Sequence, residues 1–284
     1  MTVSGQGLGA ADDCGSGWNV LATGRRSVCT REAWSAFGAN STCCYSTCAQ
    51  LGKCAGGSAT WTNGSANCGW STCFEDLDFF MAMLADVEAA LCVDTVRRFV
   101  TGGSNGGMMI HRLAAEMPSY WAAVLPIYGL PLQGDGGYAG VPAALANVSI
   151  LQFHDRWDAT IPVAGGKSGQ GWFYTGLETV LRTWLALGAP AVEAAAAAGE
   201  GTGAGAATAA MPAAAVPVPV PVPTKWDGGA QSLACWEYSP ATAALPLGAG
   251  RRRIMKCLFD GYHGSWLPAT NGEELTWWFM RQFI

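Results

Sequence analysis

The chain has 284 residues, of which 50% are hydrophobic and only 13% are charged, and this composition excludes an intrinsically disordered protein. Its formal net charge of -5 argues against a nucleic-acid-binding protein, because such proteins usually carry a basic balance or a basic stripe. The one basic run, three arginines at residues 251–253, leads into an apolar segment, and we interpret it as the solvated start of a strand.

The first zone, residues 1–73, is rich in cysteine, glycine, serine and threonine and lacks hydrophobic periodicity. Eight of the eleven cysteines lie in it: Cys14, Cys29, Cys43, Cys44, Cys48, Cys54, Cys68 and Cys73. So many cysteines indicate an oxidising compartment, and we predict loops joined by disulfides and packed on the rest of the chain. A zinc site is the alternative, since the gaps Cys44-x3-Cys48 and Cys68-x4-Cys73 are ligand-like. The first histidine, His111, is distant in sequence, which favours disulfides.

The cysteine content and the N-terminus point in different directions. Residues 1–7 contain neither a basic nor an apolar stretch, so this chain begins without a signal peptide. We therefore expect an extracellular, secreted protein whose natural beginning is missing from this chain. We expect no membrane span, because the longest apolar tract, residues 204–223, ends in alternating valine and proline, which cannot form a helix.

Helical and strand-like patterns alternate from residue 74 onward. Helices are predicted over 74–91, 105–117, 172–187 and 273–283, and strands over 98–101, 121–128, 148–153, 235–238 and 253–259. This alternation predicts an α/β protein with a mostly parallel sheet flanked by helices. Residues 188–224 are a low-complexity Ala/Gly/Pro insertion, which we interpret as an exposed loop within a domain covering 74–284. Cys235 and Cys257 can bridge two of the predicted strands, although their spacing does not establish it.

The sequence GGSNGG at residues 102–107 fits the G-x-S-x-G nucleophile elbow of α/β-hydrolases, with a predicted strand before it and a predicted helix after it. In such an elbow the serine, here Ser104, is exposed on a sharp turn. The alternative is a glycine turn in which Ser104 only caps the helix. As the residue after the nucleophile, Asn105 would offer one backbone N–H to an oxyanion.

A serine nucleophile needs a histidine base and an acid that orients it, in the chain order serine, acid, histidine. That order selects His263, which follows the last predicted strand, over His111 and His154. Two carboxylates, Asp155 and Asp158, lie between Ser104 and His263 in the sequence, directly after a predicted strand. Spacing alone leaves both open as the acid. The second oxyanion donor usually comes from an upstream His-Gly loop, and no histidine precedes His111.

Several segments together resemble the family of secreted polyhydroxybutyrate depolymerases and feruloyl esterases. They are EDLDFF at 75–80, LCVD at 91–94, TGGSNGGMM at 101–109, WAAV at 121–124, H-x3-D-x2-IP at 154–162 and GYHGSW at 261–266. The resemblance covers roughly residues 70–187 and 230–284, and it assigns the acid to Asp158. It departs from the family at Asp155, where glycine is usual, in the insertion, and in the opening strands and His-Gly loop, which have no counterpart.

The resemblance implies an α/β-hydrolase that is missing its first strands and acts as a serine carboxylic-ester hydrolase through an acyl-enzyme. The expected substrate is a polymer or polysaccharide-linked ester, either a feruloyl or acetyl ester or a polyhydroxyalkanoate. Neither a cofactor, a metal nor an obligate protein partner is implied. Trp157 and Trp266 are candidates for stacking on a sugar or an aromatic acyl group, or they belong to the core. The alternative function is a catalytically impaired, carbohydrate-binding or adhesive protein on the same scaffold.

Overall fold

A computed structural model describes residues 75–132, 148–168, 173–186, 218–220, 233–238, 253–264 and 269–283, together with residues 3, 5, 8–9, 16–18 and 20. The eight cysteines of the predicted disulfide-rich region lie outside the described residues, and so does Trp266. The predictions that concern them therefore remain predictions.

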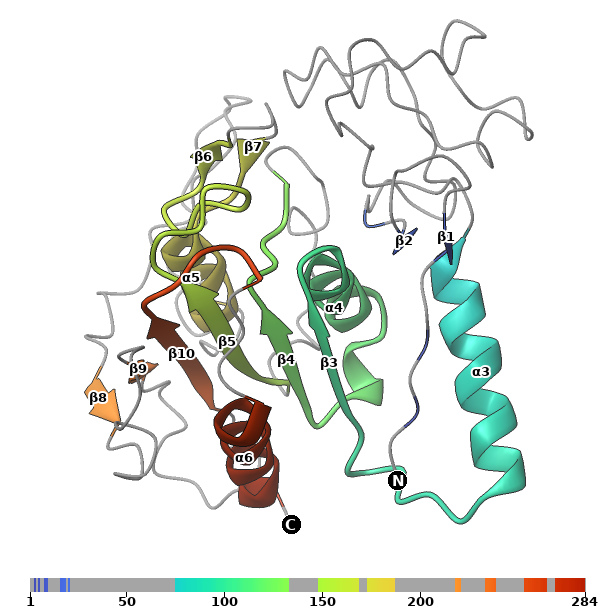
Figure 1. Ribbon diagram of the computed structural model, residues 1–284. Helices are drawn as coiled ribbons and strands as arrows, with labels where there is room; N and C mark the ends of the chain where they lie inside the picture. The colour runs from blue at the N-terminus through green and yellow to red at the C-terminus, as the bar shows by residue number, and fades with distance from the viewer. Residues whose placement is uncertain are drawn as a thin grey trace, which may run out of the picture.

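The described chain is organised around a six-stranded sheet with the order β3-β4-β5-β10-β9-β8 (Figure 1). Its strands are β3 (Phe99–Gly103), β4 (Ala123–Ile127), β5 (Ser149–Asp155), β10 (Ile254–Phe259), β9 (Leu233–Tyr238) and β8 (Val218–Val220). The first four pair in parallel, and β9 and β8 are added antiparallel. Two small hairpins pair β1 (Leu8–Gly9) with β2 (Ser16–Gly17) and β6 (Gly166–Lys167) with β7 (Phe173–Tyr174). The prediction of a mostly parallel sheet flanked by helices is confirmed.

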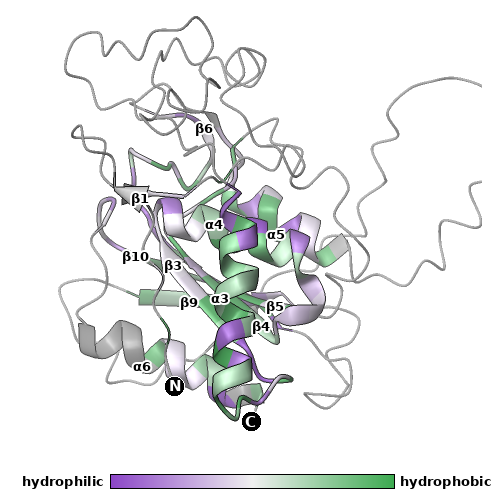
Figure 2. Ribbon diagram, turned by 90° about the vertical axis from the view of Figure 1, so that its right-hand side faces the viewer, coloured by the Kyte–Doolittle hydropathy of each residue, from purple (hydrophilic) through white to green (hydrophobic). Residues whose placement is uncertain are grey.

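Helices cover both faces of this sheet (Figure 1). They are α3 (Asp76–Ala90), α4 (Asn105–Glu116), α5 (Leu177–Ala186) and α6 (Ala269–Met280), with short 3-10 turns η1 (Pro118–Tyr120) and η4 (Arg281–Phe283). Successive strand residues face opposite sides. Val124 and Ile150 accordingly belong to the apolar cluster formed with α3, α4 and α5, while Leu151 packs in a second cluster with α6. Figure 2 shows hydrophobic and hydrophilic residues on both α3 and α4.

Two predictions about local structure are corrected. The helix predicted over 172–187 begins only at Leu177, because Phe173–Tyr174 forms β7 and Gly176 lies against the backbone of Ala164. A Cβ at Gly176 would stand 2.5 Å from the Ala164 oxygen, so the chain turns there before the helix starts.

The prediction that the whole 188–224 insertion is an exposed loop is wrong for Val218–Val220. These residues form β8, which pairs antiparallel with β9. A Val-Pro-Val segment is compatible with an edge strand, because the extended backbone suits proline and the outer side of an edge requires no donor. The low-complexity insertion thus contributes a strand to the sheet.

Cys235 and Cys257 lie opposite each other on β9 and β10 and form a disulfide, with their Cα atoms 4.0 Å apart. Cys92 is an exposed free thiol. Within the described part of the chain, helices are too short or too polar to cross a membrane.

Candidate active site

Ser104 occupies the sharp turn between β3 and α4. Its φ of 53° lies in the left-handed region, which is strained for a residue with a side chain. The turn is held on both sides, because the Ser104 N–H donates to the Ile127 carbonyl at 3.0 Å and the Ser104 carbonyl accepts from the Met108 N–H at 3.0 Å. The arrangement is a strand–turn–helix elbow, as the GGSNGG motif predicts.

The glycines around Ser104 are required by close approach of backbone to backbone. A Cβ at Gly107 would stand 2.7 Å from the Ile127 oxygen, and one at Gly129 would stand 2.5 Å from the Ser104 oxygen. At Gly106, by contrast, the nearest atom to a Cβ would be the Trp18 indole nitrogen at 4.0 Å. Only side-chain-free residues at 107 and 129 let the helix and β4 pass this closely.

We expect Gly107→Ala to lower the free energy of unfolding by about 1–3 kcal/mol, because backbone atoms that cannot yield surround the added methyl group. Chemical denaturation followed by circular dichroism measures this change. The matched control is Gly106→Ala in the same helical turn, which is expected to be neutral or slightly stabilising, since alanine favours the helix. Equal losses in both variants would contradict the close-approach argument.

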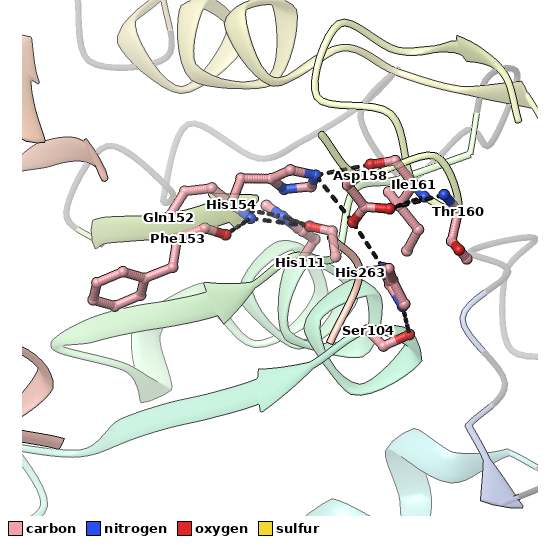
Figure 3. A network of polar contacts seen from close by, with 10 residues as sticks. Ser104, His111, Gln152, Phe153, His154, Asp158, Thr160, Ile161 and His263 are labelled. Atoms are coloured by element: carbon pink, nitrogen blue, oxygen red, sulfur yellow. Dashed lines mark hydrogen bonds and ion pairs between the residues drawn. The ribbon is translucent and has the colours of Figure 1, made fainter. Parts of the chain in front are cut away.

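Three polar side chains from distant parts of the chain form a hydrogen-bonded series next to this turn (Figure 3). Ser104 Oγ lies 2.8 Å from His263 Nε2, and His263 Nδ1 lies 2.7 Å from Asp158 Oδ2. Ser104 follows β3, Asp158 follows β5 and His263 follows β10, so all three stand beyond the carboxyl ends of parallel strands. Open α/β sheets place their sites at this edge. The geometry is that of a nucleophile, its base and an orienting acid.

The Asp158 carboxylate is buried and fixed by its own loop. Its Oδ1 accepts hydrogen bonds from the backbone N–H of Thr160 at 2.8 Å and of Ile161 at 2.7 Å, which leaves Oδ2 for His263. Sequence spacing leaves Asp155 and Asp158 equally open as the acid, and the structure brings Asp158 to the histidine.

His154 supports the same loop, a role that sequence reasoning missed. Its Nε2 lies 2.8 Å from the Ile161 carbonyl and 3.6 Å from Asp158 Oδ2. Burial lowers the pKa of His154 to about 4, so the ring is neutral near pH 7 and donates its Nε2–H to Ile161. The available signal was its place at the start of the H-x3-D motif.

His111, the third histidine, is a core residue of α4. Its Nε2 approaches the Gly129 carbonyl at 3.2 Å and Gln152 Oε1 at 3.0 Å. Burial lowers the pKa of His111 to about 4. Its contacts join α4 to β5 and to the residue Gly129.

Asn105 binds the N-terminal segment to the elbow. Its side-chain Oδ1 accepts from the Trp18 N–H at 2.5 Å, and its Nδ2 donates to the Trp18 carbonyl at 3.2 Å. Trp18 in turn packs on Phe80, with ring centroids 4.9 Å apart. Since its side chain is engaged in this way, Asn105 offers the candidate site only its backbone N–H, at the start of α4.

A groove of about 1180 Å³ runs between α3 and β3 and has Ser104 and Asn105 among its lining residues. Its walls are largely apolar and include Phe80, Leu84 and Met109. Trp157 lies beyond β5 and is 61% exposed, so it is a surface residue and not part of the core. Among the described residues, His, Cys, Asp and Glu form no group of three that could hold a metal ion.

Asp155 is the second carboxylate of the predicted pair. Its side chain is completely buried, and neither carboxylate oxygen has a hydrogen-bond partner in the described part of the chain. Burial, reinforced by the negative charge of Asp158, raises the pKa of Asp155 to about 7. The folded protein therefore holds a proton on Asp155 at pH values where the unfolded chain has lost it.

We therefore expect the free energy of unfolding to fall as the pH rises, because Asp155 must lose its proton in the folded state. Between about pH 4 and pH 7 the folded state binds more protons at this site than the unfolded state, so the free energy of unfolding falls as the pH rises. Asp155→Asn removes this dependence, because the amide never ionises. We expect the stability of the variant relative to the parent to increase by roughly 2–3 kcal/mol between about pH 5 and pH 8.

Urea denaturation across this pH range measures that difference. Asp260→Asn is the control, because the Asp260 carboxylate is partly exposed and paired with Arg156. A flat difference between parent and Asp155→Asn would contradict the assignment of a neutral Asp155.

The elbow, the mostly parallel sheet and the helices on both faces define an α/β-hydrolase fold. No family model matches the chain. A stretch of 102 residues, 35% of the chain, is 36% identical to the probable feruloyl esterase C of Aspergillus clavatus and 37% identical to the feruloyl esterase C of Emericella nidulans. It covers 35% of each of these proteins, so the chain spans about a third of the length of the curated relatives it matches.

A solved thermostable esterase matches 40% of this chain and 26% of its own, at 19% identity and a TM-score of 0.32.

Proposed function

We propose that the protein is a serine carboxylic-ester hydrolase that works through an acyl-enzyme. The observation that carries this proposal is the continuous series of hydrogen bonds from Ser104 through His263 to Asp158. Ser104 Oγ attacks the ester carbonyl while His263 Nε2 takes its proton, and Asp158 stabilises the imidazolium that forms. His263 then gives the proton to the leaving alcohol. Water, activated by the same histidine, releases the acyl group.

The Asn105 backbone N–H would stabilise the oxyanion of each tetrahedral intermediate, since it belongs to the residue after the nucleophile and lies at a helix N-terminus. No cofactor enters these steps.

The proposed substrate is a feruloyl or acetyl ester linked to an extracellular polysaccharide, or a polyhydroxyalkanoate. The matched relatives are named feruloyl esterase C, and the apolar groove beside Ser104 suits an apolar acyl group. Exposed Trp157 offers a face on which a sugar or an aromatic ring stacks. Secretion is part of the same proposal.

The test combines labelling and turnover. A fluorophosphonate probe should label the folded protein, and mass spectrometry should locate the label on Ser104. Methyl ferulate, feruloylated arabinoxylan, acetylated xylan and a polyhydroxyalkanoate film then report the substrate. Absent labelling of folded protein, together with binding to the polysaccharide, would instead favour the carbohydrate-binding alternative.

Trp157→Ala should raise the KM for a feruloylated polysaccharide about three- to tenfold and leave kcat little changed, because a stacking contact of this kind is worth about 0.5–1.5 kcal/mol. Steady-state kinetics with arabinoxylan and with methyl ferulate measure the effect, and Trp157→Phe should restore most of the binding. An equal fall in kcat on both substrates would show that Trp157 supports the site itself.

A further inference from the structure

The proposed acyl transfer makes no use of Asp155, although this residue lies at the end of β5 only three positions before Asp158. A buried carboxylate without a hydrogen-bond partner is costly when it is ionised, because the charge has lost its water and gained nothing in return. The sequence nevertheless places an ionisable residue next to the candidate triad.

Strand geometry shows which way Asp155 faces. Leu151 and Phe153 of β5 pack in the cluster that contains α6, and alternation places Asp155 on the same side. His154 points the other way, toward Ile161. The Asp155 side chain is therefore buried on the α6 side of the sheet, at the carboxyl end of β5.

Three titratable groups interact electrostatically with Asp155: Asp158 on the loop that follows β5, and His263 and Tyr128 from other segments. Asp158 and His263 both act electrostatically on Asp155. Tyr128 follows β4, and the charges of Asp155 and Asp158, together with burial, raise its pKa. The Tyr128 ring makes an edge contact with His263 at a centroid distance of 5.1 Å, so both side chains border the same space.

The guanidinium of the neighbouring Arg156 has partners other than Asp155. Arg156 pairs with Asp260 at 2.9 Å and donates to the Leu258 carbonyl at 3.2 Å. Opposite Asp155 on β10 stands Phe259, which is apolar. The imidazolium of His263, which forms during the proposed reaction, is a positive charge that acts on Asp155.

We propose that Asp155, buried and without a hydrogen-bond partner in the described part of the chain, is a second carboxyl of the catalytic centre, whose charge strengthens the negative field that stabilises the His263 imidazolium. This inference rests on the proposed function. Asp155 acts through His263 and contacts no reacting atom, so it is a positioning residue. When it ionises, its proton passes to solvent, and no bond to the substrate is formed or broken.

A pH profile separates this role from a merely structural one. The histidine must be unprotonated to act, which gives one ionisation on the acid side of the profile. Because burial raises the pKa of Asp155 to about 7, its ionisation adds a second rise in the neutral range. We expect this rise to be about three- to tenfold, which corresponds to a coupling of up to about one pKa unit.

The experiment measures the second-order rate of fluorophosphonate labelling of Ser104 from about pH 5 to about pH 9 in the parent chain, Asp155→Asn and Asp260→Asn. Labelling depends on the serine and its base and requires no knowledge of the substrate. The parent and Asp260→Asn should show two ionisations, and Asp155→Asn should show one. An Asp155→Asn profile with the same shape as that of the parent would overturn the proposal.

Infrared difference spectroscopy provides a measurement that needs no activity. The carbonyl band of a protonated carboxylic acid should be present in the parent at about pH 5, disappear by about pH 9, and be missing from Asp155→Asn. If the band is absent from the parent, the neutral resting acid is disproved. Two-step labelling without hydrolysis of any ester would contradict the proposed function alone, and ester hydrolysis with one-step labelling would contradict this inference alone.

Discussion

Ser104→Ala is expected to lower kcat for methyl ferulate by about 10⁶-fold, because the nucleophile that forms the acyl-enzyme is lost. The elbow itself should survive, since its hydrogen bonds to Ile127 and Met108 come from the backbone. The variant should therefore unfold at nearly the same temperature as the parent while fluorophosphonate labelling disappears. Steady-state assays, thermal unfolding and gel fluorescence measure the three quantities.

Ser119→Ala is the control for this substitution, because Ser119 lies exposed in η1. It should keep full labelling and turnover. Ester hydrolysis that persists in Ser104→Ala at more than about a thousandth of the parental rate would place the nucleophile elsewhere.

Asp158→Asn is expected to lower kcat by about 10⁴-fold with a smaller effect on KM. The amide retains an oxygen that can accept from Thr160 and Ile161, so the loop should keep its conformation. Its NH₂ group then faces His263 Nδ1, which favours the wrong tautomer of the base and removes the charge that stabilises the imidazolium. Pre-steady-state measurement of acylation isolates this step.

Asp260→Asn again serves as the matched carboxylate control, since the Asp260 carboxylate is partly exposed and pairs with Arg156. If Asp155→Asn shows the 10⁴-fold loss and Asp158→Asn does not, the acid is Asp155. Losses of equal size in both variants would show that the two carboxylates act as one unit.

Local pattern was sufficient for the parts of the fold that depend on neighbours in sequence. The elbow could be recognised because its glycines are needed within a few residues of Ser104, and α4 because its apolar residues repeat along the helix. The parallel pairing of most strands followed from the alternation of helix and strand, whereas their order in the sheet came from the structure.

Contacts between segments that are distant in the sequence could not be predicted, because no local sequence pattern indicates them. The bond between Asn105 and Trp18 joins residues 87 positions apart, and nothing in either neighbourhood signals it. The choice between Asp155 and Asp158 could not be made from spacing, because it depends on whether the side chain at the end of β5 or the one on the following loop reaches His263, which lies 105 residues beyond Asp158. The pairing of β8 was likewise hidden by a composition that usually indicates a spacer.

The proline of β8, Pro219, has a consequence for how the protein behaves in concentrated solution. Among the described residues β8 is the last strand of the sheet, and Pro219 at its centre has no N–H to donate. A strand from a second molecule that approached β8 would receive no backbone hydrogen bond from Pro219. A proline at the centre of this strand therefore disfavours edge-to-edge association through β8.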